Sequence, residues 1–343
     1  MNKFYISSKS GVSGVCKYAH DFYNLVLKNR GFIFLDSSDG LQVILSKVKL
    51  VDEVHIEIGI FQKTEVDILF FLLKKGNKNV TVTLHDPPIV KYPFYQFKNP
   101  FLNKVSKFYD IYFNSGGVAN KYLKNIKTIY VLSVKGADAV RSRYNLTNVK
   151  FLPHILDVNE VEKCNSVNNN FIYFGFIGRN KGIEYSLKLH QHLLIKHPEI
   201  MYYVAGTAIG DEVNHYNYLK KTYTKNVQFL GYVPDDQLGE LFKKASFAPL
   251  LFKDYKFYNP FSGSILYSLK KGKIVLTNPV NTTNELIRDG KNGFFLTQVL
   301  EDDSKKLTEL FDKKSLLIDV RNEIYHSLLV NYSADAVNKI YNC

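Results

Sequence analysis

The sequence predicts an α/β protein with two parallel β-sheets. Short β-branched or aromatic runs alternate with longer helical segments, which is the pattern of repeated βαβ units. The alternation stops in a polar stretch at 163–170 and restarts at Phe171. A length of 343 residues suits two domains, and a hydrophobic share of 45% can fill two cores. We therefore expect two Rossmann-like domains.

The first domain is expected over residues 1–162. Its helices include 15–28 and 64–75. Its strands are expected at 4–7, 32–36, 53–58, 80–84, 111–114, 129–132 and 149–152. The polar residues 163–170 show no periodicity, so they are predicted to be a linker.

The second domain is expected over residues 171–326. Its strands are predicted at 171–176, 201–205, 227–229, 247–250, 274–277 and 293–296. From residue 302 onward the pattern is helical, and the last helix, at about 327–343, is expected to pack back on the first domain.

Charge and composition restrict the class of protein. The formal net charge of +13 favours anionic partners, and the absence of a nucleic-acid-binding motif argues against nucleic acid. Three distant cysteines indicate neither a disulfide framework nor a zinc site. The N-terminus lacks an apolar signal core, and no apolar run reaches the length of a membrane span, so a cytoplasmic location is expected.

Two segments of the first domain could contribute to a site. Gly11 and Gly14 lie between the first strand and the first helix, where backbone N–H groups can approach a phosphate. The alternative is a tight turn. His85 follows the strand VTVTL and precedes two prolines, so it should lie at the carboxyl end of that strand. It could donate to a sugar hydroxyl or a phosphate, or only to local backbone.

The second domain offers a basic segment and a hydroxyl-rich segment. The first is FGFIGRNKGI, in which Gly175 precedes Arg179 and Lys181 at a helix entry, and it suits either a diphosphate site or an ordinary basic turn at the surface. The second is YNPFSGSILYSLKKG, where Ser262, Gly263 and Ser264 begin an apolar helix and form either an anion site or an ordinary N-cap.

In chain order, these segments resemble the large retaining family 4 of glycosyltransferases, which has the GT-B fold. The resemblance covers nearly the whole chain and is clearest over residues 171–296. The family's glycine-to-Lys-Gly diphosphate segment resembles FGFIGRNKGI, and its later segments resemble NVQFLGYVPDDQLGELFKKASFAPL and SLKKGKIVLTNPVNTTNELIRDGKNGFF. Upstream, VTVTLHD resembles the strand whose final histidine faces the donor sugar.

The resemblance implies a role for each matching position. His85 and Lys181 are the expected catalytic residues, acting on the donor sugar or its phosphate and on the diphosphate. The donor-binding residues implied are Gly11, Gly14, Gly175, Arg179, Gly231, Tyr232, Asn259, Ser262, Gly263, Ser264, Tyr267 and Glu285. The resemblance implies no metal and no cofactor; the nucleoside diphosphate sugar is a co-substrate.

The chain departs from the family at three positions. The family's arginine, five residues before the lysine, falls on Phe176, and Arg179 could replace it. The paired family glutamates fall on Asn259 and Tyr267. Some family members carry a Ser-Gly-Ser segment in place of the first glutamate, and this chain resembles that branch.

The expected function is transfer of a sugar from a nucleoside diphosphate donor to a glycan acceptor, with retention, in bacterial surface polysaccharide synthesis. A non-catalytic GT-B protein that binds nucleotide sugars is an alternative, because both glutamates are replaced. A GT-B sugar-nucleotide epimerase is a further alternative, although the order of the C-terminal motifs counts against it.

Residues 89–108 combine aromatic side chains with lysines. Lys91, Lys98, Lys104 and Lys107 could bind an anionic membrane surface and bring a lipid-linked acceptor to the protein. This expectation makes the protein peripheral on the inner face of the cell membrane. The alternative is that the aromatic residues belong to the core and the lysines are solvated.

Overall fold

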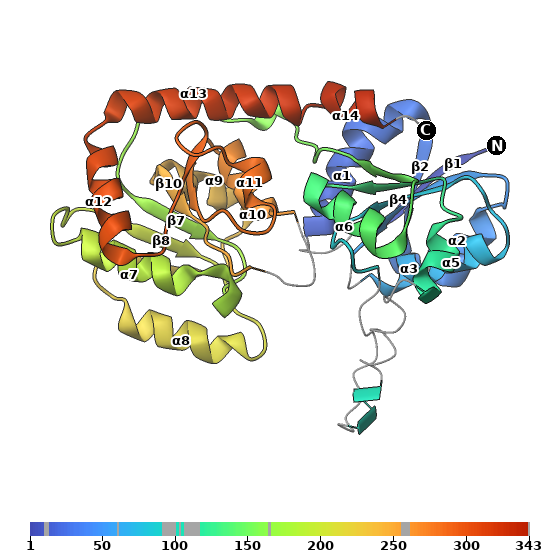
Figure 1. Ribbon diagram of the computed structural model, residues 1–343, viewed down its shortest axis with the longest axis horizontal. Coiled ribbons are helices and arrows are strands. Elements are labelled where there is room, and N and C mark those ends of the chain that lie inside the picture. Colours follow the sequence, from blue (N-terminus) through green and yellow to red (C-terminus); the bar gives the residue numbers. More distant parts are fainter. Residues whose placement is uncertain are drawn as a thin grey trace. The chain divides into compact units, whose positions relative to one another are not determined.

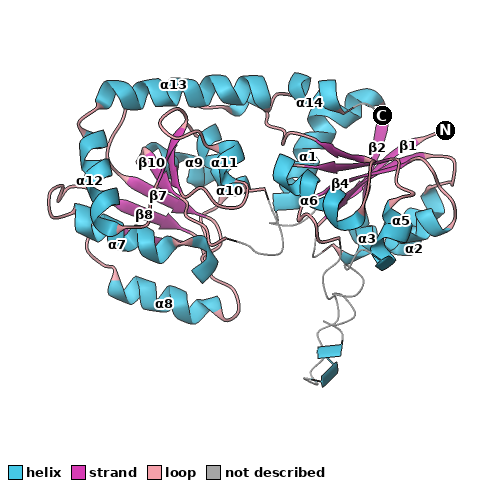
Figure 2. Cartoon of the chain, viewed as in Figure 1, coloured by secondary structure: helices cyan, strands magenta, loops and turns pink. Residues whose placement is uncertain are grey.

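The computed structural model describes residues 1–9, 14–59, 62–90, 101–102, 104–105, 117–163, 166–254 and 261–341 (Figures 1 and 2). The chain forms two compact units. Unit 1 comprises Met1–Asp157, Tyr255–Phe261 and Asn331–Cys343, and unit 2 comprises Val158–Asp254 and Ser262–Val330.

Unit 1 contains a six-stranded parallel sheet in the order β2-β1-β3-β4-β5-β6. The strands are β1 Lys3–Ser7, β2 Phe32–Asp36, β3 Glu53–Ile58, β4 Val80–Leu84, β5 Thr128–Val131 and β6 Val149–Phe151. The chain passes from β1 to β2 on one side and then returns to β3 on the other. The strand order therefore reverses between β1 and β3, and ligands of open α/β sheets bind at the carboxyl ends near such a reversal.

Helices cover both faces of this sheet (Figure 1). They are α1 Gly14–Phe22, α2 Leu41–Lys47, α3 Lys63–Lys74, α5 Gly117–Leu123, α6 Val134–Tyr144 and α14 Ala334–Ile340. One core cluster joins the sheet to α2, α3, α5 and α6 through aliphatic side chains such as Ile56 and Leu69. The second cluster is aromatic and joins the opposite face to α1 and α14 through Tyr18, Phe22 and Tyr341.

Unit 2 contains a second six-stranded parallel sheet, in the order β12-β11-β10-β7-β8-β9. The strands are β7 Phe171–Phe174, β8 Tyr202–Ala205, β9 Val227–Gly231, β10 Phe247–Pro249, β11 Ile274–Thr277 and β12 Gly293–Phe295. The helices are α7 Ile183–Leu193, α8 Glu212–Thr222, α9 Asp235–Lys243, α10 Gly263–Lys270, α11 Thr283–Leu286, α12 Leu300–Phe311 and α13 Lys314–Asn331. The strand order reverses between β7 and β10.

The predicted fold class is confirmed, since both sheets are parallel and are covered by helices. The predicted strand at 111–114 lies outside the described residues. The expected helical segment at 15–28 is confirmed, but its helix type changes: α1 ends at Phe22 and continues as a π-helical turn, Tyr23–Leu27, and a 3-10 turn, Lys28–Arg30. Gly31 follows with φ 80°, a backbone conformation that glycine adopts readily.

Ion pairs and a backbone hydrogen bond join the first residues of unit 2 to the end of α10. Glu160 pairs with Lys270, and Glu162 pairs with Lys271 at 2.7 Å. The amide of Glu162 also donates to the carbonyl of Lys270 at 2.8 Å. These contacts explain why unit 2 begins at Val158, whereas the sequence suggested that the first domain extends to residue 162.

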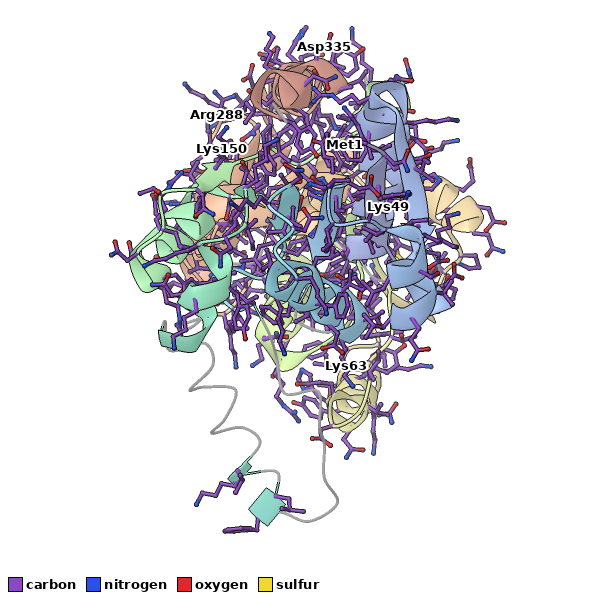
Figure 3. The ribbon with its side chains drawn as sticks, turned by 90° about the vertical axis from the view of Figure 1, so that its right-hand side faces the viewer. Met1, Lys49, Lys63, Lys150, Arg288 and Asp335 are labelled. Atoms are coloured by element: carbon purple, nitrogen blue, oxygen red, sulfur yellow. The ribbon has the colours of Figure 1, made fainter. Side chains whose placement is uncertain are left out.

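Three exposed lysines of unit 1 lie on different parts of its described residues. Lys49, Lys63 and Lys150 have exposed side chains and lie after α2, at the start of α3 and in β6 (Figure 3). Over the described ranges, no helix is both long enough and apolar enough to cross a membrane.

Candidate functional site

His85 is held at the carboxyl end of β4 by the turn that follows it. The turn contains the cis Pro87-Pro88 bond. The hydroxyl of Tyr144, at the end of α6, donates to the carbonyl of Pro88 at 2.7 Å. On the same helix, a Cβ at Gly136 would lie 2.5 Å from Cγ of Pro87, so only glycine fits there. Helix α6 therefore fixes the backbone beside His85.

The imidazole of His85 is hydrogen-bonded to a buried carboxylate. Its Nε2 lies 2.7 Å from Oε2 of Glu57, which comes from the neighbouring strand β3. The Glu57 side chain is fully buried, whereas that of His85 is 9% exposed. Burial by itself would raise the pKa of Glu57, but hydrogen bonds from His55 and His85 and their charges outweigh it and lower that pKa to about 2. Glu57 is therefore an anion at neutral pH.

Glu57 belongs to a wider polar network on the same face of the sheet. Its Oε1 accepts from the Tyr5 hydroxyl at 2.8 Å and lies 3.2 Å from Nε2 of His55. His55 is also within 2.9 Å of Thr83 and 2.8 Å of Thr81, and its Nδ1 lies 3.2 Å from the hydroxyl of Tyr341. The network thus runs from the C-terminal end of the described chain to His85.

Aromatic side chains cover this network. The ring of Tyr18, on α1, lies edge-on 5.0 Å from the ring of His85 and 4.8 Å from that of His154. Phe261 stacks on His154 at 4.9 Å. Desolvation lowers the pKa of His154 to about 3, so this imidazole is neutral and adds no charge near His85.

The start of α1 lies beside the ends of β3 and β4. Gly14 is the first residue of α1. A Cβ at Gly59, just after β3, would lie 3.2 Å from Cγ2 of Val15 and 3.6 Å from Oδ2 of Asp86. The structure therefore brings Gly14 and His85 to the same edge of the sheet, while Gly11 lies outside the described residues.

In unit 2, the loops after β7 and β8 are in contact. Gly175 has φ 111°, and a Cβ at Gly206 would collide with its carbonyl oxygen. The chain then forms a 3-10 turn, Arg179–Lys181, that leads into α7. Arg179 is exposed, and both its backbone N–H (3.2 Å) and its guanidinium (3.4 Å) contact the carboxylate of Glu212. Arg179 thus has a carboxylate partner already.

Lys181 lies at the reversal point between β7 and β10. Its Nζ is 5.1 Å from the ring centre of Phe252, and desolvation lowers the pKa of the amine. Just before it, the Asn180 carbonyl accepts from the amide of Lys253 at 3.1 Å. Gly182 has φ 60°, and a Cβ there would lie 2.7 Å from that of Leu251. Lys181 has no carboxylate partner within the described part of the chain.

The hydroxyl-rich segment forms the start of α10. Ser262 is the N-cap, and its Oγ accepts from the amide of Ile265 at 3.4 Å and lies 3.3 Å from Oγ of Ser264. A Cβ at Gly263 would meet no atom within 4 Å. Tyr267 is half-buried, and its ring packs against Phe174 at 4.7 Å. Asn259 lies outside the described residues.

The remaining predicted residues lie farther along the sheet. Gly231 ends β9 with φ 69°, and the Tyr232 side chain beside it is 67% exposed. Strand β8 separates β9 from β7. Glu285 is exposed on α11, which follows β11. All three are at the carboxyl side of the sheet.

Glu57 and His55 were not predicted as site residues from the sequence. A signal for them exists, because strands buried on both faces of a parallel sheet are normally apolar throughout. In the strands EVHIEI and VTVTL, polar residues recur at every second position and therefore share one face. That alternation indicates a buried polar cluster.

Comparisons with known proteins identify a similar family and a similar fold. Residues 158–325 match the family model described as Glycosyl transferases group 1. An uncharacterized glycosyltransferase of Methanocaldococcus jannaschii is 25% identical over 280 residues, which cover 77% of this chain and 67% of that protein.

Solved structures show the same fold. HepE of Anabaena, in complex with UDP, aligns with a TM-score of 0.65 at 14% identity, over 99% of this chain and 98% of that one. TarM of S. aureus, solved as a mutant in complex with Fondaparinux, alpha-GlcNAc-glycerol and UDP, aligns with a TM-score of 0.63 at 13% identity. That alignment covers 88% of this chain but 57% of TarM, so the chain spans little more than half of it.

Residues 158–325 are therefore similar to the glycosyl transferases group 1 family, and the two parallel sheets give the chain the α/β architecture of the GT-B glycosyltransferases.

Proposed function

We propose that this chain transfers a sugar from a nucleoside diphosphate donor to a glycan acceptor with retention, in the synthesis of bacterial surface polysaccharide. The observation that carries the proposal is Lys181. This cation lies at the reversal point of the sheet in unit 2, its charge is disfavoured by burial, and no carboxylate offsets it among the described residues. An anionic ligand would supply the missing counter-charge. HepE, a protein of the same fold, was solved with UDP and with UDP-glucose.

The proposed chemistry needs stabilisation of the leaving diphosphate more than covalent help. Lys181 would neutralise it, and the first amides of α10, at Gly263 and Ser264, would donate to it. Arg179 would have to leave Glu212 to take part. The resemblance to family 4 assigns His85 to the donor sugar or its phosphate. The proposal invokes no metal ion.

A donor screen tests the proposal. Calorimetry with UDP-, GDP-, ADP- and dTDP-sugars should find one that binds, and transfer to a lipid-linked glycan should follow. Turnover of the donor without an acceptor would instead indicate an epimerase. Binding without turnover under any condition would indicate a non-catalytic protein, and binding of none of the donors would contradict all three readings.

Replacing His85 by alanine should reduce turnover far more than donor affinity. We expect kcat to fall by about 100-fold or more, the scale of one lost donor to a developing charge, while the Kd of the nucleotide stays the same. The nucleotide is assigned to unit 2 and His85 belongs to unit 1. His20→Ala is the control, because its side chain is 77% exposed on α1 in the same unit. Wild-type turnover in the His85 variant would remove this residue from the mechanism.

The membrane expectation remains a proposal, since most of residues 89–108 lie outside the described residues. Phe101, Leu102 and Val105 are described, and they expose 70%, 44% and 51% of their surface. Exposed apolar side chains beside lysines suit the boundary of a bilayer. We expect sedimentation with anionic vesicles that weakens in salt and falls when the four lysines of this segment become glutamine.

The control for the vesicle experiment is a second quadruple variant with the same net charge as the first. Glutamine at four exposed lysines elsewhere in unit 1 removes the same charge but should leave vesicle binding intact; suitable residues are Lys49, Lys74, Lys121 and Lys150. Equal loss in both variants would mean that binding reflects net charge alone.

A further inference from the structure

The described contacts of His85 point to a residue that acts through it. Within the described ranges, its imidazole has one hydrogen-bond partner, the carboxylate of Glu57. We propose that Glu57 is a positioning residue for His85, which fixes the ring orientation and determines which ring nitrogen carries the proton. This inference rests on one part of the proposed function, namely that His85 takes part in sugar transfer.

The sheet register brings the two side chains together. Glu57 on β3 lies opposite Thr83 on β4, and His85 comes two residues later on the same face. The amide of His85 continues the ladder by donating to the carbonyl of Ile58 at 2.9 Å. The 2.7 Å contact between Nε2 and Oε2 therefore follows from paired backbone, so neither side chain needs a special loop conformation.

The carboxylate has little freedom to turn. Its other oxygen, Oε1, accepts from the hydroxyl of Tyr5 at 2.8 Å and lies 3.2 Å from His55. Rotation of the carboxylate would break these contacts in a site that excludes water. Oε2 is thus held facing His85, and the Tyr18 ring restricts the imidazole from the side.

An ionised carboxylate can only accept hydrogen bonds. Nε2 of His85 must therefore carry a proton, and Nδ1 becomes the nitrogen available to a ligand. In the neutral ring Nδ1 accepts, and in the protonated ring it donates. Partners that fix the tautomer in this way are common around functional histidines. Glu57 consequently determines the chemical character that His85 presents.

Glu57→Gln makes a sharp test, because it changes no more than one atom of the side chain. The Tyr5 hydroxyl donates to the Oε1 position, so the amide oxygen should stay there. The amide NH2 then takes the Oε2 position, where it faces Nε2 as a donor. We expect this variant to convert His85 from the Nε2–H to the Nδ1–H tautomer.

Long-range 15N–1H spectra of the imidazoles measure this directly, with the His85 signals assigned by their loss in His85→Ala. The matched control is Glu53→Gln, a buried acid on the same strand that lies 3.6 Å from Lys3 at the opposite end of β3. We expect Nε2–H in the wild type and in the control. An Nδ1–H ring in the wild type, or an unchanged ring in folded Glu57→Gln, would overturn the proposal. The wild-type spectrum decides the matter even if Glu57→Gln does not fold.

Activity gives a second, independent measurement. Glu57→Gln should lower kcat by about 10-fold or more with little change in the KM of the donor, and it should add nothing further in a His85→Ala background. Additive losses would show that Glu57 acts apart from His85 and would contradict the proposal. If the wild type transfers no sugar, the proposed function fails, whereas the tautomer measurement still decides the role of Glu57.

Discussion

Replacing Lys181 by alanine should weaken the binding of a nucleoside diphosphate by about 1.5–3 kcal/mol, the scale of a charge-assisted hydrogen bond. The amine rests against Phe252 at the reversal point of the sheet in unit 2, and burial lowers its pKa. A bound diphosphate would place negative charge beside the amine and stabilise its protonated form. Calorimetry with the nucleotide found in the donor screen measures the difference.

The control for Lys181 is Lys188→Ala, which removes the same charge. Lys188 is exposed on α7, where it pairs with Glu184 at 3.1 Å, so its loss should leave the affinity unchanged. Arg179→Ala should have an effect similar to Lys181→Ala only if Arg179 takes the place of the family arginine. If Lys181→Ala and Lys188→Ala bind equally well, Lys181 has no part in the site.

Tyr341→Ala should destabilise unit 1 by about 3–5 kcal/mol, as truncation of a large buried aromatic side chain does. Tyr341 is 0% exposed, and its ring lies 5.1 Å from Phe22 and 4.9 Å from Tyr130. Arg30 lies over the ring at 5.1 Å and donates to the Tyr341 carbonyl at 2.6 Å. Removal of the ring leaves a cavity in the aromatic cluster and frees the end of the chain.

Tyr341→Phe separates packing from hydrogen bonding. It keeps the ring and loses only the hydroxyl beside His55, so it should cost about 1 kcal/mol. The chain contains two units, so a global unfolding curve would combine the stabilities of both. Hydrogen exchange of the β1 and β3 amides measures the stability of unit 1 by itself. Tyr232→Ala, at an exposed position of unit 2, should leave that exchange unchanged. Wild-type protection in Tyr341→Ala would show that α14 adds little to this core.

The strands were predictable from sequence because each is a short run rich in β-branched or aromatic residues between turn residues. The predictions for 32–36, 53–58, 80–84 and 274–277 agree with the structure at both ends. The change of helix type in the second half of the predicted helical segment at 15–28 was not predictable, since the π-helical turn leaves the apolar spacing nearly intact.

The candidate site was predictable only where glycine or proline marks a strand end. Such residues identified His85 and Lys181. The partner of His85 could not be identified from the sequence, because the contact with Glu57 depends on how β3 pairs with β4. Likewise, Phe252 meets Lys181 because β10 lies beside β7, and a strand order of this kind is a property of the whole sheet.

The return of the chain to unit 1 sets an order for its biosynthesis. The polypeptide leaves unit 1 at Asp157, returns for the short segment Tyr255–Phe261, and contributes Val337 and Tyr341 to the aromatic cluster only near residue 341. At typical synthesis rates, roughly ten to forty seconds separate these two points on the ribosome. During that interval the face of the first sheet that carries His55 and Glu57 lacks α14, while nearly all of unit 2 is being made. We therefore expect the nascent protein to complete its second unit before its first, and the aromatic face to be the surface that a chaperone meets in the meantime.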